Sequence, residues 1–337
     1  MTFEAADQPG RTKADIIAYP VDDQGKATQP VVPQLIASAT EPQRCSSDNL
    51  FAAPNGQYLI RQYNCQDTVA AQLLNLNQPT SSPISLAAGY FLAWAPSGDW
   101  FLYRQIEDDQ IVLIEAADTA HQIPLDLSFG TYDAAFTPDG QQITYAASAG
   151  LRMGSEVGTI NLKDGTLVFR HEFPRQIAAF ARWSPDGQQL AYILMPDSNI
   201  PFPQGELWLA NIESGAPTEY LADVDAGHGF PPAWSADSQT LVYVHRENPD
   251  MILADQQADA LHSNIHQIDI ASGSVTPLTA FSDSQVYAAV WSPDGQTLAF
   301  TAADAVWQVI PGQLPTQVSN ADIARHPTWL SRPATKQ

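Results

Sequence analysis

The residues best suited to chemistry are four histidines that are close together in the sequence. They are His228, His245, His262 and His266. Imidazole nitrogens and carboxylates are common ligands of transition metals, so His228 and His245 could share a metal ion. Asp225 or Glu247 would then complete the ligand set. The spacing matches no ligand motif, and His266 is expected to point into a sheet. Surface or structural hydrogen bonding is therefore the simpler interpretation of these histidines.

No catalytic or nucleotide-binding motif accompanies them. The chain lacks G-x-S-x-G, the phosphate-binding G-x-x-x-x-G-K-[ST] loop and any paired-cysteine zinc pattern. Runs of carboxylates, such as Asp22-Asp23 and Glu107-Asp108-Asp109, fall in short turn segments, where a solvated loop explains them. The sequence thus predicts no catalytic residue and no cofactor, and an enzyme is the less favoured interpretation.

The two cysteines, Cys45 and Cys65, flank a hairpin turn at Pro54–Gln57. Paired residues of a hairpin have a constant sum of residue numbers, which is 111 for Ala53 and Tyr58 and 110 for the cysteines. The thiols are therefore expected almost opposite each other, close enough for a disulfide. The bridge would contribute about 3 kcal/mol and would indicate an extracytoplasmic protein. Two unpaired, partly buried thiols are the alternative.

A repeated hairpin organises the chain that carries these residues. Its clearest copy is Trp-Ser-Pro-Asp-Gly-Gln-Gln-Leu-Ala-Tyr at residues 183–192, in which Ser-Pro-Asp-Gly suits a type I turn between two strands. The position before the turn recurs at intervals of 42, 42, 47, 51, 57 and 38 residues, at Ala52, Trp94, Phe136, Trp183, Trp234, Trp291 and Trp329. A period of about 40–50 residues with four short strands is typical of propeller blades.

Third and fourth strands follow each hairpin, for example at Glu206–Ile212 and His266–Ile270, and each ends at a glycine-containing turn. No segment has a sustained helical period, so the chain is expected to be all-β. The W-S-P-D-G-x-x-L-A-[YF] hairpin and the following L-W-L-A-N-I-E-S-G strand resemble the TolB-like (WD40-like) β-propeller repeat family over about residues 45–330. The copies depart from this pattern at Ala52, Phe136, Ala236 and Ser238.

The two ends of the chain are expected to share one blade. Residues 15–37 look like third and fourth strands, and the segment around Trp329 looks like a first strand with almost nothing after it. Joining them predicts a β-propeller of seven four-stranded antiparallel blades, with six blades as the alternative. We expect a flexible N-terminal segment at 1–14, a single propeller domain at 15–331 and a tail at 332–337.

Ligand-binding residues are expected on the funnel face of the propeller, opposite the Pro-Asp-Gly turns, where the 2–3 and 4–1 loops lie. The position four residues before each turn-preceding residue is aromatic in four of seven units, which suits a peptide side chain or a sugar face. Packing between blades is the simpler interpretation. Long loops at Leu194–Gly205 and His245–Asn264 lie on the same face. The predicted binding residues are Tyr90, Tyr132, Phe230, Tyr287, Arg325, His228, His245 and Arg246.

The charge of the chain limits its partners. A formal net charge of −22 and a pI near 4.3 repel nucleic acids and anionic membrane surfaces. No apolar run reaches the length that spans a bilayer, and the acidic start at Met1–Glu4 does not resemble a signal peptide. We expect a monomer that is periplasmic, secreted or lipoprotein-anchored, with its signal segment absent from this sequence.

Three functions fit these features. The resemblance to TolB-like propellers implies a non-catalytic protein- or peptide-binding or scaffold module, which we favour. The alternative is a metal-dependent propeller enzyme, a polysaccharide lyase or hydrolase, with His228 and His245 at its centre. The second alternative is a carbohydrate-binding propeller that uses the aromatic positions of the funnel face.

Overall fold

The computed structural model contains two compact units. The backbone is described for residues 1–6, 13–18, 34–40, 45–66, 68–78, 81–228, 230–319 and 323–330. The terminal unit combines Met1–Leu125 with Val290–Gln337, and the middle unit is Asp126–Ala289.

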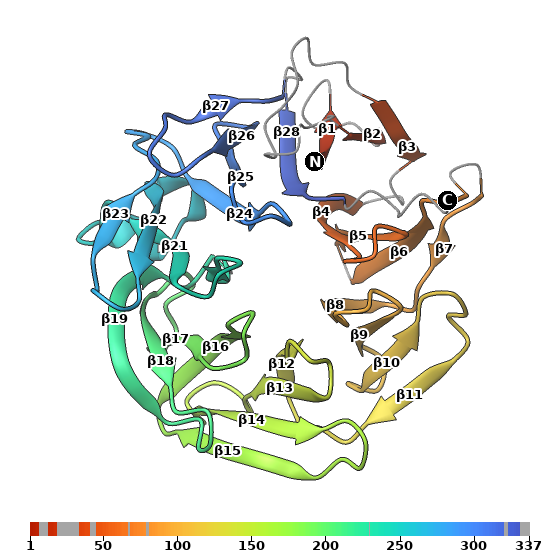
Figure 1. Cartoon of the computed structure of the whole chain (residues 1–337), viewed down its shortest axis with the longest axis horizontal. Coiled ribbons are helices and arrows are strands. Elements are labelled where there is room, and N and C mark those ends of the chain that lie inside the picture. The colour runs from red at the N-terminus through yellow and green to blue at the C-terminus, as the bar shows by residue number, and fades with distance from the viewer. Residues whose placement is uncertain are drawn as a thin grey trace. The chain divides into compact units, whose positions relative to one another are not determined.

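The strands assemble into four-stranded antiparallel sheets (Figure 1). Two sheets of the terminal unit are β4 (Cys45–Ala52), β5 (Tyr58–Cys65), β6 (Val69–Asn75) and β7 (Ile84–Ser85), and β8 (Gly89–Trp94), β9 (Trp100–Gln105), β10 (Ile111–Glu115) and β11 (Gln122–Leu125). The middle unit begins with β12 (Thr131–Phe136), β13 (Gln142–Ala147), β14 (Ser155–Asn161) and β15 (Leu167–Phe173). Its next sheet is β16 (Gln176–Trp183), β17 (Leu190–Pro196), β18 (Gln204–Ala210) and β19 (Pro217–Asp225).

The remaining strands complete the pattern. The third sheet of the middle unit is β20 (Ala233–Trp234), β21 (Thr240–Arg246), β22 (Ser263–Asp269) and β23 (Val275–Pro277). Two short 3₁₀ helices, η1 (Ile252–Asp255) and η2 (Ala258–Ala260), lie in the loop between β21 and β22. The sixth sheet is β24 (Val286–Trp291), β25 (Leu298–Ala302), β26 (Ala305–Val309) and β27 (Thr316–Gln317). The predicted all-β class of four-stranded antiparallel blades is confirmed.

A seventh sheet joins the two ends of the chain within the terminal unit. Its order is β28 (Ile323–Thr328), β1 (Thr2–Ala6), β2 (Lys13–Ala18) and β3 (Gln34–Thr40). The count of seven sheets among the described residues agrees with the preferred prediction. Within the N-terminal segment 1–14, Thr2–Ala6 forms a strand whose backbone pairs with both β2 and β28. Five residues are too few to show strand alternation clearly in a sequence.

The repeated turn has one hydrogen-bonding pattern throughout. The N–H of its fourth residue donates to the C=O of its first at 2.8–3.0 Å in the copies that begin at Ala53, Ala95, Thr137, Ser184, Ser235 and Ser292. In one copy the Ser184 hydroxyl also donates to Asp186 at 2.6 Å and accepts the N–H of Gln189 at 2.9 Å. The fourth residue has a positive φ, which favours glycine. Ser238 adopts φ 62° there and is therefore strained.

Tryptophans before these turns link neighbouring sheets of the same unit. The indole N–H groups of Trp94, Trp234 and Trp329 donate at 3.0 Å to the backbone carbonyls of Phe51, Arg182 and Val290, respectively. Each acceptor immediately precedes the equivalent position of the previous repeat. The tryptophans therefore hold consecutive repeats together.

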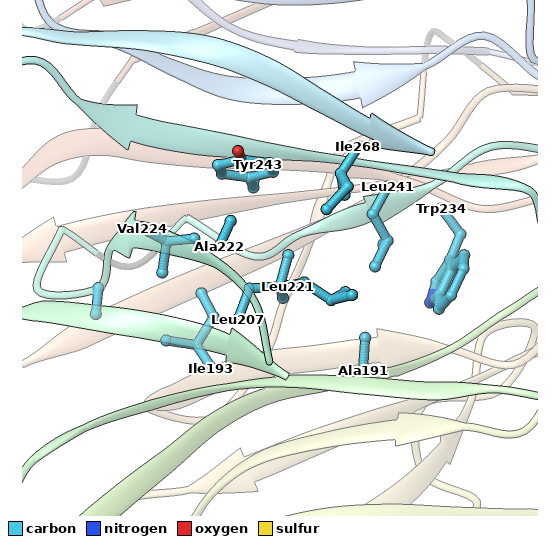
Figure 2. Close-up of a cluster of buried hydrophobic side chains, with 11 residues drawn as sticks. Ala191, Ile193, Leu207, Leu221, Ala222, Val224, Trp234, Leu241, Tyr243 and Ile268 are labelled. Carbon is cyan, nitrogen blue, oxygen red and sulfur yellow. The ribbon is translucent and has the colours of Figure 1, made fainter. Parts of the chain in front are cut away.

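A hydrophobic cluster fills the space between two sheets of the middle unit (Figure 2). Ile193, Leu207 and Val224 come from the sheet of β16–β19, whereas Leu241 and Tyr243 come from β21 of the next sheet. Each fully buried large aliphatic side chain contributes about 1.5–3 kcal/mol. This packing fixes the strand ends from which the loops of the middle unit begin.

Candidate functional site

The two ends of the middle-unit sheets differ in their connections. The turn end carries the 1–2 and 3–4 turns, and the loop end carries the 2–3 and 4–1 loops. The loop end comprises 126–130, 148–154, 174–175, 197–203, 226–228, 230–232, 247–262 and 278–285.

Three residues predicted from the sequence meet in a stack of rings in the middle unit. The stack runs from Phe202 through His228 and Phe230 to Tyr287, with successive centroids 4.5, 6.3 and 5.2 Å apart and interplanar angles of 12°, 11° and 18°. Phe202 was missed by sequence reasoning, because it occupies no repeat position. The only signal for it was the unusual length of its loop.

A buried ion network adjoins the stack through His228. Asp225 accepts hydrogen bonds from His228 Nδ1 at 2.8 Å and from Arg246 Nη2 at 2.7 Å. Arg246 also donates to Asp255 at 2.6 Å and to the backbone carbonyl of Phe202 at 2.7 Å. The side chain of Arg246 is only 1% exposed. Arg246 was expected to contact a partner, but its side chain is buried and instead connects segments of the protein itself through these hydrogen bonds.

The second ring nitrogen of His228, Nε2, is buried without a hydrogen-bond partner among the described residues. Since the Asp225 carboxylate can only accept, the hydrogen-bond network assigns a proton to Nδ1. The described residues contain no group of three or more histidine, cysteine or acidic side chains placed to hold a metal. The described residues therefore place no such ligand group around either His228 or His245.

His245 packs on a neighbouring strand of its own sheet. Its ring stacks on that of His266, with centroids 4.5 Å apart and an interplanar angle of 21°, and its Nδ1 is 3.3 Å from the carbonyl of Asp223. His266 Nε2 is 3.4 Å from a Glu247 oxygen. Burial lowers the pKa of His266, and the nearby His245 lowers it further, against the opposing effect of Glu247.

An apolar pocket of about 530 Å³, pocket A, opens at the loop end of the middle unit. Its wall includes the side chains of Tyr132, Leu151, Phe180, Met195, Ile200 and Pro201. The volume lies in the range of ligand-binding sites, about 300–1,000 Å³. The Tyr132 hydroxyl donates to the carbonyl of Ala178, and burial raises its pKa well above the ordinary value. Of the binding residues predicted from the sequence, Tyr132 is the one that lines pocket A.

The wall of pocket A contains a strained residue. Phe180 has φ 56° and lies in a bulge of β16, where the register with β17 shifts between Ala179 and Arg182. Ala288 and His326 occupy the equivalent position of their repeats, three residues before the tryptophan that precedes the turn. Their φ angles are 55° and 57°. Because this conformation recurs in several repeats, it belongs to the repeat itself, where the bulge redirects the side chain at this position.

A second pocket and exposed apolar side chains border pocket A. Pocket B has a volume of about 470 Å³ and is lined by Phe129, Met153, Gly154 and Phe173, among others. Phe129, Leu151 and Met153 are 79%, 59% and 69% exposed. Large apolar side chains that gather at one surface are typical of interaction sites. Sequence reasoning missed this group, whose signal is the Leu-Arg-Met tip between Gly150 and Gly154.

The other predicted residues belong to the terminal unit. Tyr90 lies on β8 and is 40% exposed, and Arg325 on β28 pairs with Asp304. Cys45 and Cys65 are direct register partners on β4 and β5. A bulge between Ser47 and Asn49 shifts the pairing by one residue and thereby brings the two positions opposite each other.

Comparison with known proteins identifies the fold. No family profile and no curated protein sequence matches the chain. Hydrazine synthase of Kuenenia stuttgartiensis has a similar structure, with a TM-score of 0.59 and 16% identity over 79% of this chain and 77% of that one. TolB from Acinetobacter baumannii matches with a TM-score of 0.54 and 15% identity over 98% of this chain and 66% of its own.

A third similar structure is the acylaminoacyl peptidase of Pyrococcus horikoshii. Its TM-score is 0.56 at 10% identity, and the match covers 83% of this chain but only 46% of the peptidase. These likenesses, together with the four-stranded blades, define the chain as a β-propeller of the kind found in TolB proteins. At such low identity they carry no function across, since one fold hosts many activities.

Proposed function

We propose that this chain is a protein- or peptide-binding module that holds its partner at the loop end of the middle unit. The observation that carries the proposal is the gathering of exposed apolar side chains, Phe129, Leu151 and Met153, around pockets A and B. Removing apolar surface from water is worth about 25 cal/mol per Å², so a partner that covers these side chains gains binding free energy.

The composition of this surface also fits protein recognition. Aromatic residues, methionine and arginine are enriched in the centres of interfaces, and a few such residues carry most of the binding free energy. The Leu151-Arg152-Met153 tip contains two of these types, and Phe129 adds an aromatic ring. The buried Asp225–Arg246 pair positions the neighbouring loop of Phe202, so part of the surface is held in place before a partner arrives.

Selection from a random peptide library tests the proposal. We expect the immobilised protein to enrich peptides whose binding weakens about tenfold or more in L151S and M153S, since each substitution removes a contact worth more than about 1.4 kcal/mol. The matched control is I212S, which replaces an exposed apolar residue at the turn end of the same unit. Peptides that bind I212S no better than L151S, or no enrichment at all, would contradict the proposal.

We further propose that the protein works outside the cytoplasm and carries a Cys45–Cys65 disulfide. The register pairing of the two positions supports the bridge, and the fold likeness to TolB supports the location. In the described part of the chain, no helix has the length and apolar character needed to cross a membrane. Alkylation of the denatured protein before and after reduction, followed by mass spectrometry, tests the bridge. Two labelled thiols without reductant would refute it.

A further inference from the structure

Two arginines at the loop end of the middle unit have no side-chain partner among the described residues. The middle unit contains 20 acidic and six basic residues, a formal charge of −14. Three of the basic residues, Arg170, Arg182 and Arg246, are held in ion pairs. Lys163 lies in the turn between β14 and β15, at the turn end. The last two are Arg152 and Arg175, which are exposed and make no side-chain hydrogen bond or ion pair with the residues that the structure describes.

The two arginines lie on loops that touch. Arg152 belongs to the loop between β13 and β14, and Arg175 to the turn between β15 and β16 (Figure 1). A Cβ atom added to Gly154 would lie 2.4 Å from the carbonyl oxygen of Phe173 and 3.1 Å from the backbone nitrogen of Arg175. Asp197 bridges the loops, because its carboxylate accepts the Gly154 N–H at 2.8 Å and its own N–H donates to the Arg175 carbonyl at 3.1 Å.

Both arginines also hold a backbone conformation that arginine rarely adopts. Arg152 has φ 65° and Arg175 has φ 67°, in the left-handed region that favours glycine and asparagine. Such conformations persist where the surrounding structure enforces them and are concentrated at ligand-binding sites. Arg152 and Arg175 are therefore exposed residues on two adjacent loops, each held in a fixed backbone conformation.

The carboxylates of the adjacent pockets are already engaged. Asp133 of pocket A pairs with Arg182 at 2.9 Å, and the carboxylate of Asp197 binds the backbone as described. Glu156 and Glu172 of pocket B both pair with Arg170, at 3.0 and 2.8 Å. None of these four carboxylates contacts Arg152 or Arg175, so both guanidinium groups remain available to a carboxylate of a partner.

We propose that the partner segment carries a carboxylate next to apolar side chains, and that Arg152 and Arg175 bind this carboxylate. The inference rests on the proposed function and names the chemistry of the partner. Guanidinium groups form planar, bidentate hydrogen bonds with carboxylates, which a lysine cannot reproduce. Leu151 lines pocket A and Met153 lines pocket B, so the residue between them, Arg152, stands where apolar side chains on both sides would be covered.

The negative charge of the whole protein does not oppose this pairing at contact. At physiological salt the Debye length is about 8 Å, so distant carboxylates are largely screened from a bound peptide. A guanidinium–carboxylate pair in direct contact is screened much less, above all where apolar groups exclude water. The long-range field acts mainly on the rate of association, whereas the contact pair acts on the lifetime of the complex.

Peptides selected on the wild-type protein provide the test. We expect Asp or Glu beside apolar residues in the selected sequences, and a synthetic peptide with Asn or Gln in its place is expected to bind at least about tenfold more weakly. The variants R152Q and R175Q are expected to lose a similar factor for the acidic peptide and to bind the amide peptide as the wild type does. K163Q is the matched control and is expected to bind both peptides unchanged.

Charge reversal tests for a gain of peptide binding, which a misfolded variant could not show. We expect R152E with R175E to bind a lysine version of the selected peptide better than the acidic version. If the selected peptides depend on Leu151 but tolerate the amide exchange and both arginine substitutions, the carboxylate inference is overturned while the proposed function stands. If the library yields no peptide, the proposed function fails and this inference with it.

Discussion

The two ends of the middle-unit sheets follow opposite rules. At the turn end the same hydrogen bonds recur: the hydroxyl of Thr137, Ser184 or Ser235 donates at 2.6 Å to an aspartate two residues later. At the loop end the described connections carry different contacts from one repeat to the next. They contain the stack at His228, an ion network around Arg246 and the strained residues Arg152 and Arg175.

This difference separates structural repetition from function. A feature that recurs in every repeat serves what the repeats share, which is the packing of one sheet on the next. A feature that occurs once has no such general reason. The exposed Leu151 and Met153 and the unpartnered Arg152 and Arg175 are of the second kind. The turn end also has a pocket, of about 720 Å³, beside Pro185 and Ile212. The presence of a pocket alone therefore does not identify the binding surface.

The largest effect is expected from the ion network of the loop end. Replacing Arg246 by alanine leaves the Asp225 carboxylate buried without its main partner, and breaking a buried pair costs about 3–5 kcal/mol. Chemical denaturation measures this loss in the free energy of unfolding. R170A is the matched control, because its ion pairs are exposed and a far smaller change is expected. Equal losses in the two variants would contradict the structural role of Arg246.

The second-largest effect is expected when one glycine at each end of the middle-unit sheets is replaced by alanine. Gly154 and Gly187 have φ 72° and 70°, so an alanine at either position is strained by about 1–2 kcal/mol. At Gly187 the added methyl group meets nothing within 4 Å, whereas at Gly154 it meets the Phe173 carbonyl at 2.4 Å. We expect G154A to unfold at lower denaturant than G187A, by about 1–3 kcal/mol of additional destabilisation from crowding. Equal stability of the two variants would mean that the loops do not pack as described.

A smaller effect is expected at the repeated turn. The Ser235 hydroxyl donates to Asp237 at 2.6 Å and accepts the N–H of Thr240 at 3.0 Å. S235A therefore leaves the Thr240 N–H without its acceptor and leaves Asp237 with the hydrogen bond from the Gln239 N–H alone. We expect a loss of about 1–2 kcal/mol in the free energy of unfolding, with peptide binding at the loop end unchanged. The exposed Ser274 is the control, and S274A is expected to stay within about 0.5 kcal/mol of the wild type.

The smallest effect is expected in how the stability of the protein depends on pH. The hydroxyl of Ser235, and after it the N–H of Gln239, lowers the pKa of Asp237 below its ordinary value of 3.8. A carboxyl whose pKa falls on folding stabilises the protein above the unfolded pKa and ceases to do so as pH falls through the folded pKa. The difference in Tm between the wild type and D237N is therefore expected to be full well above pH 3.8 and to shrink as the pH falls below that value. A difference independent of pH would contradict this cause.

The sequence predicted the repeated parts of the fold and fewer of the unique ones. The interval between Trp183 and its equivalents was enough to predict the sheets, because each copy carries its own turn and strand pattern. The stacking of His228 with Phe202 could not be predicted from the sequence, since the two residues come from different loops whose paths depend on tertiary packing. The same holds for Arg246, whose burial depends on Asp225 and not on its own neighbours in the chain.

The most direct test of the central claim is amide hydrogen exchange with and without a peptide selected on the protein. We expect slower exchange on binding in residues 148–154, 174–176 and 197–203, with no change in the turns at 137–142 and 184–189. Protection of these turns, or of the residues around the pocket at Pro185 and Ile212, would place the partner at the turn end and contradict binding at the loop end.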